Sequence, residues 1–272
     1  MGANAKRKGQ RLGQHFLMDS AICSRIVTEA KIQKDDFVLE IGPGAGALTG
    51  ILYSMCASRL TLIEPDEKLL GKLQNRYPEA KLIAKRAEDV NFNDLPGPLV
   101  VVSNLPYYAS VHILKHCTDY RANISRMILM FQKEVARRIN ALPGRKAYGS
   151  LSVFSRYHWE MEELMTIEPS AFKPPPRVHS VLLRFLPHHV PPVETDEEKF
   201  FGLVREAFTH KRRTLRNNLK GFYTSDSIDA AYAAAGLDAR VRAEAVTLEE
   251  FAAMLPCLIV ETNGKGRAVK GG

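Results

Sequence analysis

Short apolar runs alternate with helical patterns through the first two thirds of this 272-residue chain. Each run has the length and the content of Val, Ile and Leu that are typical of a buried β-strand. Parallel strands need crossover connections, which are usually helices, so the alternation predicts a doubly wound α/β sheet. The predicted strands are FVLEIG (37–42), LTLIE (60–64), KLIA (81–84), PLVVVSN (98–104) and RMILMF (126–131).

Three further elements follow this alternation. KEVARRINAL (133–142) is typical of a helix, and Pro143-Gly144 ends it. LSVFSRYHW (151–159) and RVHSVLLRFL (177–186) are rich in β-branched and aromatic residues, which favours strands. We expect these two to close the sheet as an antiparallel hairpin.

The composition changes at PHHVPPVETDEEK (187–199), a Pro-rich and acidic stretch without periodicity that is typical of a linker. Beyond it, four segments carry apolar residues at helical spacing, which predicts a small all-helical domain. The expected organisation is a catalytic domain over 1–187, with a basic arm and helix in 1–34, a linker over 188–198, a helical domain over 199–262 and a disordered tail over 263–272.

The composition is that of an ordinary soluble protein, with 45% hydrophobic and 25% charged residues. No apolar run approaches the ~20 residues of a membrane span, and the basic N-terminus lacks the apolar core of a signal peptide. We therefore expect a cytoplasmic protein with no membrane partner. The four cysteines form no C-x-x-C pair and are expected to be reduced and mostly buried. His188-His189 has no further ligand at suitable spacing, so no metal site is expected.

The formal net charge of +8 is concentrated in two stretches of the chain. Residues 1–34 contain seven Lys and Arg against two carboxylates, and residues 205–220 contain six against one. Such local excess favours an anionic partner, and nucleic acid is the leading candidate.

A glycine-rich turn, Gly42-Pro43-Gly44-Ala45-Gly46, joins the first predicted strand to a helix. Glycines at this point let the backbone approach a ligand and turn its amides toward it. The spacing fits both a dinucleotide fingerprint and the loop of class I methyltransferases, which bind S-adenosylmethionine. Glu64 ends the second predicted strand 22 residues after Gly42, where an acceptor for ribose hydroxyls belongs in either class.

Two acidic residues, Glu88 and Asp89, follow the third predicted strand. Either carboxylate could accept a hydrogen bond from the exocyclic amine of a cofactor adenine. The spacing does not decide between them.

The tetrapeptide Asn104-Leu105-Pro106-Tyr107 ends the fourth predicted strand, 62 residues after Gly42. Ligands bind at the carboxyl ends of strands in an open α/β sheet, so this tetrapeptide should face the same crevice as the glycine loop. Its groups suit methylation of an adenine amine, whose lone pair is delocalised into the ring. The Asn104 amide oxygen and the Pro106 carbonyl would accept the two N–H bonds and free that lone pair, while Tyr107 would stack on the base. The pair of motifs therefore favours a methyltransferase over a nicotinamide enzyme.

With these residues in place, the sequence resembles the dimethyladenosine transferases of small-subunit ribosomal RNA, the KsgA family. The resemblance covers about 210 residues in seven ordered blocks. These are RLGQHFL (11–17), EIGPGAGALT (40–49), SNLPYYAS (103–110), FQKEVARRI (131–139), KAYGSLSV (146–153), PSAFKPPPRVHS (169–180) and AFTHKRRTLRNNL (207–219). It implies a Rossmann-like class I methyltransferase sheet followed by a small helical domain.

The resemblance also implies roles for individual residues. The implied catalytic residues are Asn104, Pro106, Tyr107 and Phe172, the last as the aromatic residue opposite Tyr107. S-adenosylmethionine would be bound by His15, Leu17, Gly42, Gly44, Glu64, Glu88 and Asn104, and RNA phosphates by Lys211, Arg212, Arg213 and Arg216. His15 stands where the family usually has Asn, and Glu88 where it has Asp.

The activity that the resemblance implies is transfer of two methyl groups to N6 of each of two adjacent adenosines in the 3′-terminal hairpin of small-subunit (16S) rRNA. The partner would be this RNA within a pre-30S particle, and we expect the protein to act as a monomer. Two alternatives stay open. One is a large-subunit rRNA adenine N6-methyltransferase of the macrolide-resistance type, and the other is a mainly non-catalytic ribosome-assembly or nucleic-acid-binding factor.

Overall fold

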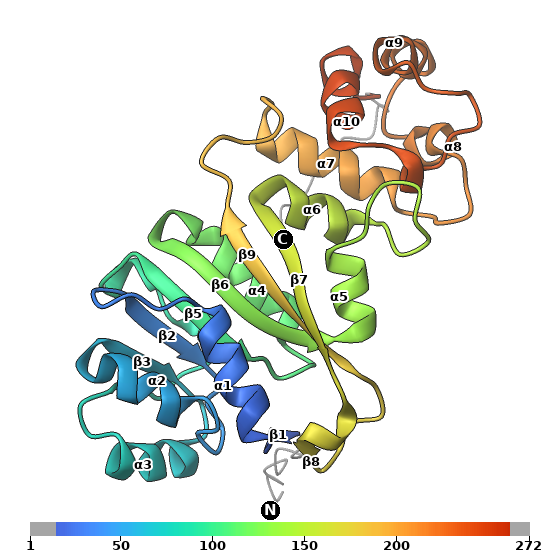
Figure 1. The fold of residues 1–272 in the computed structure, drawn as a ribbon. Helices are drawn as coiled ribbons and strands as arrows, with labels where there is room; N and C mark the ends of the chain where they lie inside the picture. The colour runs from blue at the N-terminus through green and yellow to red at the C-terminus, as the bar shows by residue number, and fades with distance from the viewer. Residues whose placement is uncertain (1–14, 262–272) are drawn as a thin grey trace, which may run out of the picture. The chain divides into compact units, whose positions relative to one another are not determined.

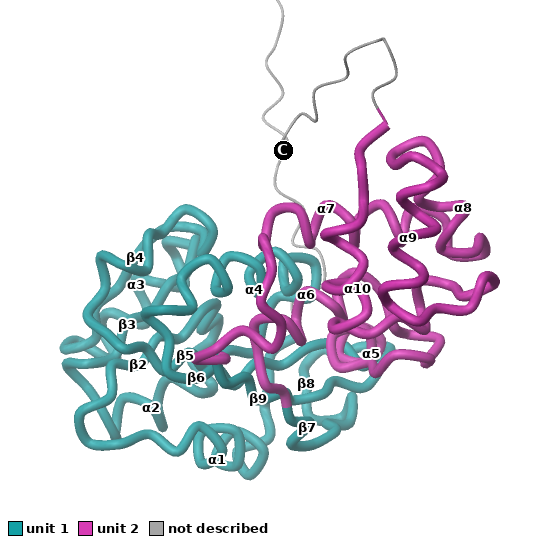
Figure 2. Tube along the Cα trace, turned by 90° about the horizontal axis from the view of Figure 1, so that it is seen from above, with its two compact units in different colours: residues 1–133, 162–187 teal, residues 134–161, 188–272 magenta. Residues whose placement is uncertain are grey.

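The computed structural model describes residues 15–261, which form two compact units (Figure 2). The first unit comprises residues up to 133 together with 162–187, and the second comprises 134–161 together with the residues from 188 onward. The basic residues predicted in the N-terminal arm before His15, and the tail predicted to be disordered, lie outside the described residues.

A seven-stranded sheet in the order β4-β3-β2-β5-β6-β9-β7 organises the first unit (Figure 1). Strands β2 to β6 pair in parallel, and β9 pairs antiparallel with β6. All five strands predicted before residue 132 are present, so the predicted α/β sheet is confirmed. Their bounds are β2 Phe37–Ile41, β3 Leu60–Ile63, β4 Lys81–Ile83, β5 Leu99–Asn104 and β6 Ile124–Gln132, followed by β7 Trp159–Ile167 and β9 Ser180–Pro187.

Crossover helices connect the parallel strands, as the alternation predicts. They are α2 Thr49–Cys56, α3 Glu67–Arg76 and α4 Ser110–Asp119, and α1 Ser20–Glu29 precedes the sheet. The Asp19 side chain begins α1 by accepting hydrogen bonds from the backbone amides of Ala21 and Ile22, which have no partner within the helix. Short 3-10 turns complete the connections at Ala57–Arg59, Ala87–Asp89, Phe92–Asp94, Arg121–Asn123 and Pro169–Ala171.

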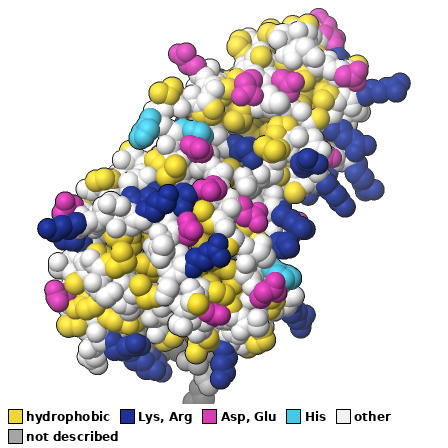
Figure 3. Space-filling view, viewed as in Figure 1, with side chains coloured by type: hydrophobic (Ala, Val, Ile, Leu, Met, Phe, Trp, Pro, Cys, Tyr) yellow, Lys and Arg dark blue, Asp and Glu magenta, His cyan; other side chains and the backbone are white. Residues whose placement is uncertain are grey.

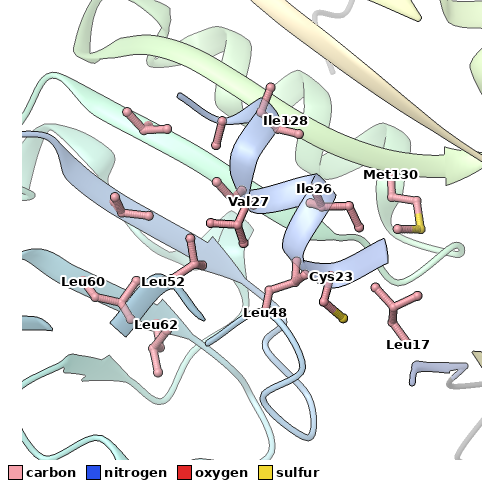
Figure 4. Packing of buried hydrophobic residues seen from close by; sticks show 14 of the residues in the cluster. Leu17, Cys23, Ile26, Val27, Leu48, Leu52, Leu60, Leu62, Ile128 and Met130 are labelled. Carbon is pink, nitrogen blue, oxygen red and sulfur yellow. The ribbon is translucent and has the colours of Figure 1, made fainter. Parts of the chain in front are cut away.

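The buried face of α1 packs on the sheet and anchors the N-terminal part of the unit (Figure 4). Cys23, Ile26 and Val27 of this helix belong to one apolar cluster with side chains from α2 and from strands β2, β3, β5 and β6. Burying a Val, Leu or Ile side chain stabilises a fold by about 1.5–3 kcal/mol. The cluster therefore holds the strand ends that carry the glycine loop and the tetrapeptide.

The prediction of a strand over 151–159 is wrong, because residues Ser150–His158 form helix α6. Its aromatic and β-branched residues have high strand propensity, but propensity is a weak constraint beside capping and burial. The backbone N–H of Gly149 donates to the Ser152 hydroxyl at the start of the helix, and Leu151, Val153 and Tyr157 are buried. The strand begins only at Trp159.

The division into units also differs from the predicted catalytic domain over 1–187. Both divisions break the chain after residue 187, but residues 134–161 belong to the second unit. The reason is packing: Val153 and Tyr157 of α6 share an apolar cluster with Phe200 of α7, and the rings of Tyr157 and Phe200 lie 5.2 Å apart. A contact across more than 40 residues of sequence leaves no local signal.

The second unit is otherwise helical, as predicted. It begins with α5 Lys133–Ile139 and α6, and the four predicted C-terminal helices are α7 Glu197–Ala207, α8 Leu215–Leu219, α9 Ser225–Ala235 and α10 Leu248–Met254, with 3-10 turns at Ala243–Ala245 and Leu255–Cys257. Asp196 caps α7, so the expected linker ends two residues earlier than predicted. Cys23, Cys56 and Cys117 are buried and Cys257 is half-buried, all as free thiols. No helix within residues 15–261 is long and apolar enough to cross a membrane.

Candidate active site

The glycine loop between β2 and α2 has the backbone that its sequence predicts. Gly42, Gly44 and Gly46 all have positive φ, at 65°, 55° and 86°. Residues with a Cβ rarely adopt this region, and a Cβ on Gly44 would also lie 3.2 Å from the Phe16 ring. The glycines therefore allow a close turn at the carboxyl end of β2.

Glu64 reaches this loop from the end of β3. Its carboxylate accepts hydrogen bonds from the backbone amides of Gly44, at 3.3 Å, and Asp66, at 3.0 Å. The side chain is buried, and this burial raises its pKa, although both amides oppose the shift. Glu64 thus places a carboxylate beside the glycine loop, where a ribose hydroxyl could be bound.

Glu40 lies inside β2, two residues before Gly42, and sequence reasoning assigned it no role. It is buried, and its Oε2 accepts a hydrogen bond from the Thr49 hydroxyl at 2.7 Å. Burial raises the pKa of Glu40 to about 8, against the opposing effect of the Thr49 hydrogen bond. The pair joins the strand before the glycine loop to the helix after it. A carboxylate inside an otherwise apolar run was the available signal.

The tetrapeptide meets the glycine loop because of the sheet register. Glu40 pairs with Val102 across β2 and β5, so the 62-residue spacing between Gly42 and Asn104 is the register of these two strands. The buried Ser103 hydroxyl donates to the carbonyl oxygen of Ile41, and a Cβ on Gly42 would lie 3.6 Å from the Pro106 ring. The predicted meeting of the two motifs at one edge of the sheet is confirmed.

Asn104 and Pro106 are half-buried at this edge. The Pro106 carbonyl oxygen already accepts a hydrogen bond from the Ala109 amide at 3.0 Å. A carbonyl oxygen has two lone pairs, so this turn leaves Pro106 able to accept a second donor. Asn104 and Pro106 together can offer two acceptors to one amine.

Tyr107 is held by hydrogen bonds at its side-chain hydroxyl and at its backbone carbonyl. Its hydroxyl lies 2.8 Å from the hydroxyl of Ser180, the first residue of β9, and its backbone carbonyl accepts from Ser110 at 3.0 Å. Burial raises the pKa of the Tyr107 hydroxyl, and the hydrogen bond to Ser180 opposes this. Sequence reasoning missed this contact of Ser180, because Ser180 lies 73 residues from Tyr107.

The described end of the N-terminal block reaches the same place. Strand β1 (Phe16–Leu17) pairs antiparallel with β8 (Phe172–Lys173), which places Leu17 opposite Phe172. The His15 ring lies 5.7 Å from the Tyr107 ring between centroids, and its Nδ1 is 2.7 Å from the carbonyl oxygen of Pro174. The structure therefore brings His15 to the tetrapeptide and Leu17 to Phe172.

Phe172 differs from the other predicted catalytic residues because it is only 4% exposed. It belongs to the apolar cluster that contains Leu17 and Ala171, and it makes no ring contact with Tyr107 in the described part of the chain. Its position here is that of a packing residue, and a base could stack on it only after this segment moved. The stacking role of Phe172 stays a prediction.

Glu88 and Asp89 occupy the turn Ala87–Asp89 after β4. Glu88 is half-buried and accepts a hydrogen bond from Arg86 at 3.5 Å, whereas Asp89 is exposed. A half-buried carboxylate is the better candidate for a cofactor contact, which favours Glu88.

The four predicted RNA contacts fall into two groups. Lys211, Arg212 and Arg213 are exposed in the turn before α8. Figure 3 shows Lys and Arg side chains gathered over this part of the second unit. Arg216, on α8, instead forms an ion pair with Asp229, and its guanidinium lies 5.1 Å from the centre of the Tyr232 ring. Arg216 is thus engaged within its own unit.

Within residues 15–261, no three His, Cys, Asp or Glu side chains are grouped so as to hold a metal ion. His188 bonds to the backbone of α6, through its Nε2 to Arg156 and its amide to His158. The residues at the sheet edge instead fit S-adenosylmethionine. The glycine loop provides a cradle that a Cβ would fill, Glu64 a buried acceptor, and Asn104 a polar side chain at the same edge.

A family model described as ribosomal RNA adenine dimethylase matches residues 5–259 of the chain. The chain belongs to this family. Among its relatives is the ribosomal RNA small subunit methyltransferase A of Acidobacterium capsulatum, 41% identical over 252 residues, which are 90% of this chain and 89% of the relative. The protein of the same name from Clostridium acetobutylicum is 38% identical over 253 residues, covering 90% and 91% of the two chains.

Two solved structures share the fold of this rRNA adenine dimethylase. A dimethyladenosine transferase from Plasmodium falciparum superposes with a TM-score of 0.74 at 23% identity, over 89% of this chain and 96% of the other. The 23S rRNA methyltransferase ErmE superposes with a TM-score of 0.71 at 26% identity, over 89% and 99%. The resemblance and the class I methyltransferase sheet are therefore confirmed, and the nicotinamide alternative is wrong.

Proposed function

We propose that this rRNA adenine dimethylase uses S-adenosylmethionine to dimethylate N6 of two adjacent adenosines in the 3′-terminal hairpin of small-subunit (16S) rRNA. The observation that carries the proposal is the register of β2 and β5, which joins the glycine loop to Asn104-Leu105-Pro106-Tyr107. This arrangement supports the proposal, because the glycine loop adjoins a segment with two acceptor groups and an aromatic ring. Membership of the family and the names of its curated relatives support the RNA adenine as the acceptor.

The chain's own residues activate and hold the amine. The Asn104 side-chain oxygen and the free lone pair of the Pro106 carbonyl accept hydrogen bonds from the two N–H groups of N6. These hydrogen bonds draw the nitrogen toward tetrahedral geometry. Tyr107 stacks on the base, and Ser180 and His15 keep its ring in place. Fixed orientation of two reactants accounts for much of the rate of such a reaction.

When bound, S-adenosylmethionine supplies an electrophilic methyl group on its sulfonium. Glu64 would accept hydrogen bonds from the ribose hydroxyls, and Glu88 would accept one from the adenine amine. The glycine backbone would let the cofactor approach closely, whereas the amides of Gly42 and Gly44 already donate to the Ile63 carbonyl and to Glu64. His15 and Leu17, in the segment that pairs with β8, would contact the cofactor from the N-terminal side. Since the methylated amine loses its proton readily to water, the site needs no strong general base.

The partner is the small-subunit rRNA in a pre-30S particle, on which the protein acts as a monomer in the cytoplasm. Identities of 38–41% over 90% of the chain, to relatives named for the small subunit, favour this substrate over large-subunit RNA. The structural likeness to ErmE keeps the large-subunit alternative as an outcome of the test. The cradle and the paired acceptors oppose a purely non-catalytic role.

The substrate is tested by incubating the protein and labelled S-adenosylmethionine with unmethylated small subunits or with large-subunit RNA, and then mapping the label. We expect dimethylated adenosines only in the 3′-terminal hairpin of the small-subunit RNA. Label in large-subunit RNA would support the alternative enzyme, and no label in either would support the non-catalytic factor.

Asn104→Ala should abolish methyl transfer in this assay while cofactor affinity stays within a few fold, because the variant loses an acceptor for N6 and keeps the glycine loop. Asn75→Ala is the matched control, since Asn75 is exposed on α3. Retained transfer by Asn104→Ala would remove the assigned role, and so would equal losses in the two variants.

A further inference from the structure

A hollow of about 140 Å³, lined by both polar and apolar groups, lies entirely within the second unit. It opens between α5, the start of α6, the turn before α8 and the 3-10 turn Ala243–Ala245. A single water needs only about 10–15 Å³ of such space, so the hollow has room for a larger group. None of the residues assigned to methyl transfer lines it.

The strongest sign of a ligand is an unpaired atom on the wall. Asn218 lines the hollow and is only 4% exposed. Its amide nitrogen donates to the carbonyl oxygens of Ala207, at 2.6 Å, and His210, at 3.1 Å, but its Oδ1 has no partner in residues 15–261. Leaving a buried acceptor unpaired costs about 1–3 kcal/mol. Asn218 Oδ1 is therefore available to accept a hydrogen bond from a group bound in the hollow.

The hollow is lined by both cations and carboxylates. Arg138, Lys146, Lys211 and Arg213 line the hollow, are exposed and have no carboxylate within ion-pair distance in the described part of the chain. Glu134 and Glu244 also line it, and their carboxylates disfavour a free anion inside. Four unpaired cations suit phosphates at the rim, whereas the acceptors suit a neutral donor within.

The apolar part of the wall suits a flat ring. Phe208 is half-buried in the wall, and its ring packs against Tyr148 with centroids 6.1 Å apart. The Tyr148 hydroxyl donates to the carbonyl of Val246 at 3.0 Å, which fixes this side of the hollow. Stacking on aromatic side chains is the usual way in which proteins hold an unstacked base.

We infer that the hollow binds one unstacked nucleotide of the RNA partner, with the base inside and its phosphates on the cationic rim. An amino or imino group of the base donates to Asn218 Oδ1. A neighbouring hollow shares Lys146 and Glu244 and adds Arg145, Arg240 and Arg242, so the cations continue along the adjoining backbone. This inference rests on the proposed RNA partner and deepens it, because it assigns the second unit a nucleotide pocket of its own.

The test fills the hollow without touching its buried hydrogen bonds. Ser150 is the exposed first residue of α6 and lines the hollow, so Ser150→Phe places a ring where the base would lie. Ser225 is the exposed first residue of α9 and does not line it, so Ser225→Phe is the matched control. We expect Ser150→Phe to weaken binding to unmethylated small subunits by about tenfold and Ser225→Phe to change it less than twofold. Circular dichroism checks that both variants fold.

A second measurement locates the bound nucleotide. Ser150→p-benzoylphenylalanine is irradiated in complex with the small subunit, and the crosslinks are mapped on the RNA. Crosslinks concentrated at one nucleotide support the inference. Crosslinks scattered along the backbone would overturn it, and so would an unchanged affinity of Ser150→Phe. Methylation of the small subunit by the wild-type protein is measured alongside. If it occurs, either of these contrary results leaves the proposed function intact. If it does not occur, the proposed function itself is contradicted.

Discussion

At the scale of single residues, Tyr107 shows how a side chain of the tetrapeptide is held by groups that lie far from the tetrapeptide in sequence. Its hydroxyl meets Ser180 at 2.8 Å, and its ring lies beside His15, which in turn contacts the Pro174 carbonyl. The Tyr107 side chain is thus contacted by β9 and by the N-terminal segment. A hydrogen bond of this kind contributes about 0.5–1.5 kcal/mol.

Ser180→Ala should therefore lower kcat/KM for methyl transfer about three- to tenfold, because Tyr107 loses its fixed orientation. Cofactor affinity should stay unchanged, since Ser180 does not touch the glycine loop. Steady-state kinetics and cofactor titration of the same preparation measure the two effects.

A double-mutant cycle of Ser180→Ala with Tyr107→Phe separates this positioning role from a general loss of packing. Tyr107→Phe removes the same hydrogen bond from the other side, so the double variant should be hardly slower than either single one. Fully additive losses would show that Ser180 and Tyr107 act independently, contrary to the positioning role.

At the scale of elements, the link between β2 and α2 makes the stability of the first unit depend on pH. Glu40 has a folded pKa of about 8, raised by burial, against an ordinary value of 4.5. Between these values the folded state keeps a proton that the unfolded chain has lost. Stability is therefore largest below about pH 4.5 as far as Glu40 is concerned, and falls as the pH rises to about 8.

Glu40→Gln should flatten this dependence, because an amide does not titrate. One pKa unit corresponds to about 1.4 kcal/mol, so wild type should lose on the order of a few kcal/mol relative to the variant between pH 5 and pH 8. Urea unfolding followed by circular dichroism measures it. Glu67→Gln, on exposed α3, is the control and should follow wild type. Parallel curves for wild type and Glu40→Gln would contradict the buried, protonated state.

At the scale of the whole molecule, the net charge of +8 includes cations that are free to bind an anion and cations that already contact other side chains. Lys211, Arg212 and Arg213 are exposed before α8, whereas Arg216 is paired with Asp229 and packed on Tyr232. The hydrogen bond with Asp229 raises the pKa of Arg216 and lowers that of Asp229. Sequence alone treats these four cations as one group, and the structure separates three available cations from one engaged cation.

Changing Lys211, Arg212 and Arg213 together to Gln should weaken RNA binding and reduce its dependence on salt. Each lost phosphate contact lowers the slope of log affinity against log salt by about 0.7–0.9. The triple variant should thus have a slope shallower by about 2–3, in binding measured from 50 to 300 mM salt. Arg216→Gln should keep the wild-type slope, and a slope as shallow as that of the triple variant would place Arg216 at the RNA instead.

The amino-acid sequence by itself determined the parallel strands, the four C-terminal helices and the meeting of Gly42 with Asn104. These follow from periodicity, from turn chemistry and from the rule that strand ends share one edge, all of which act over short stretches of chain. The glycine loop and the tetrapeptide could be found for the same reason, because each motif is local, whereas His15, Leu17 and Phe172 were named only through the resemblance.

Only the tertiary structure decided the rest. Ser150–His158 is helical because capping at Gly149 and burial against α7 outweigh strand propensity, and this packing also moves residues 134–161 into the second unit. The Tyr107–Ser180 bond, the burial of Phe172 and the unpaired Asn218 oxygen depend on contacts between segments far apart in sequence. Such contacts leave no local pattern, because they arise only when separately determined elements pack together.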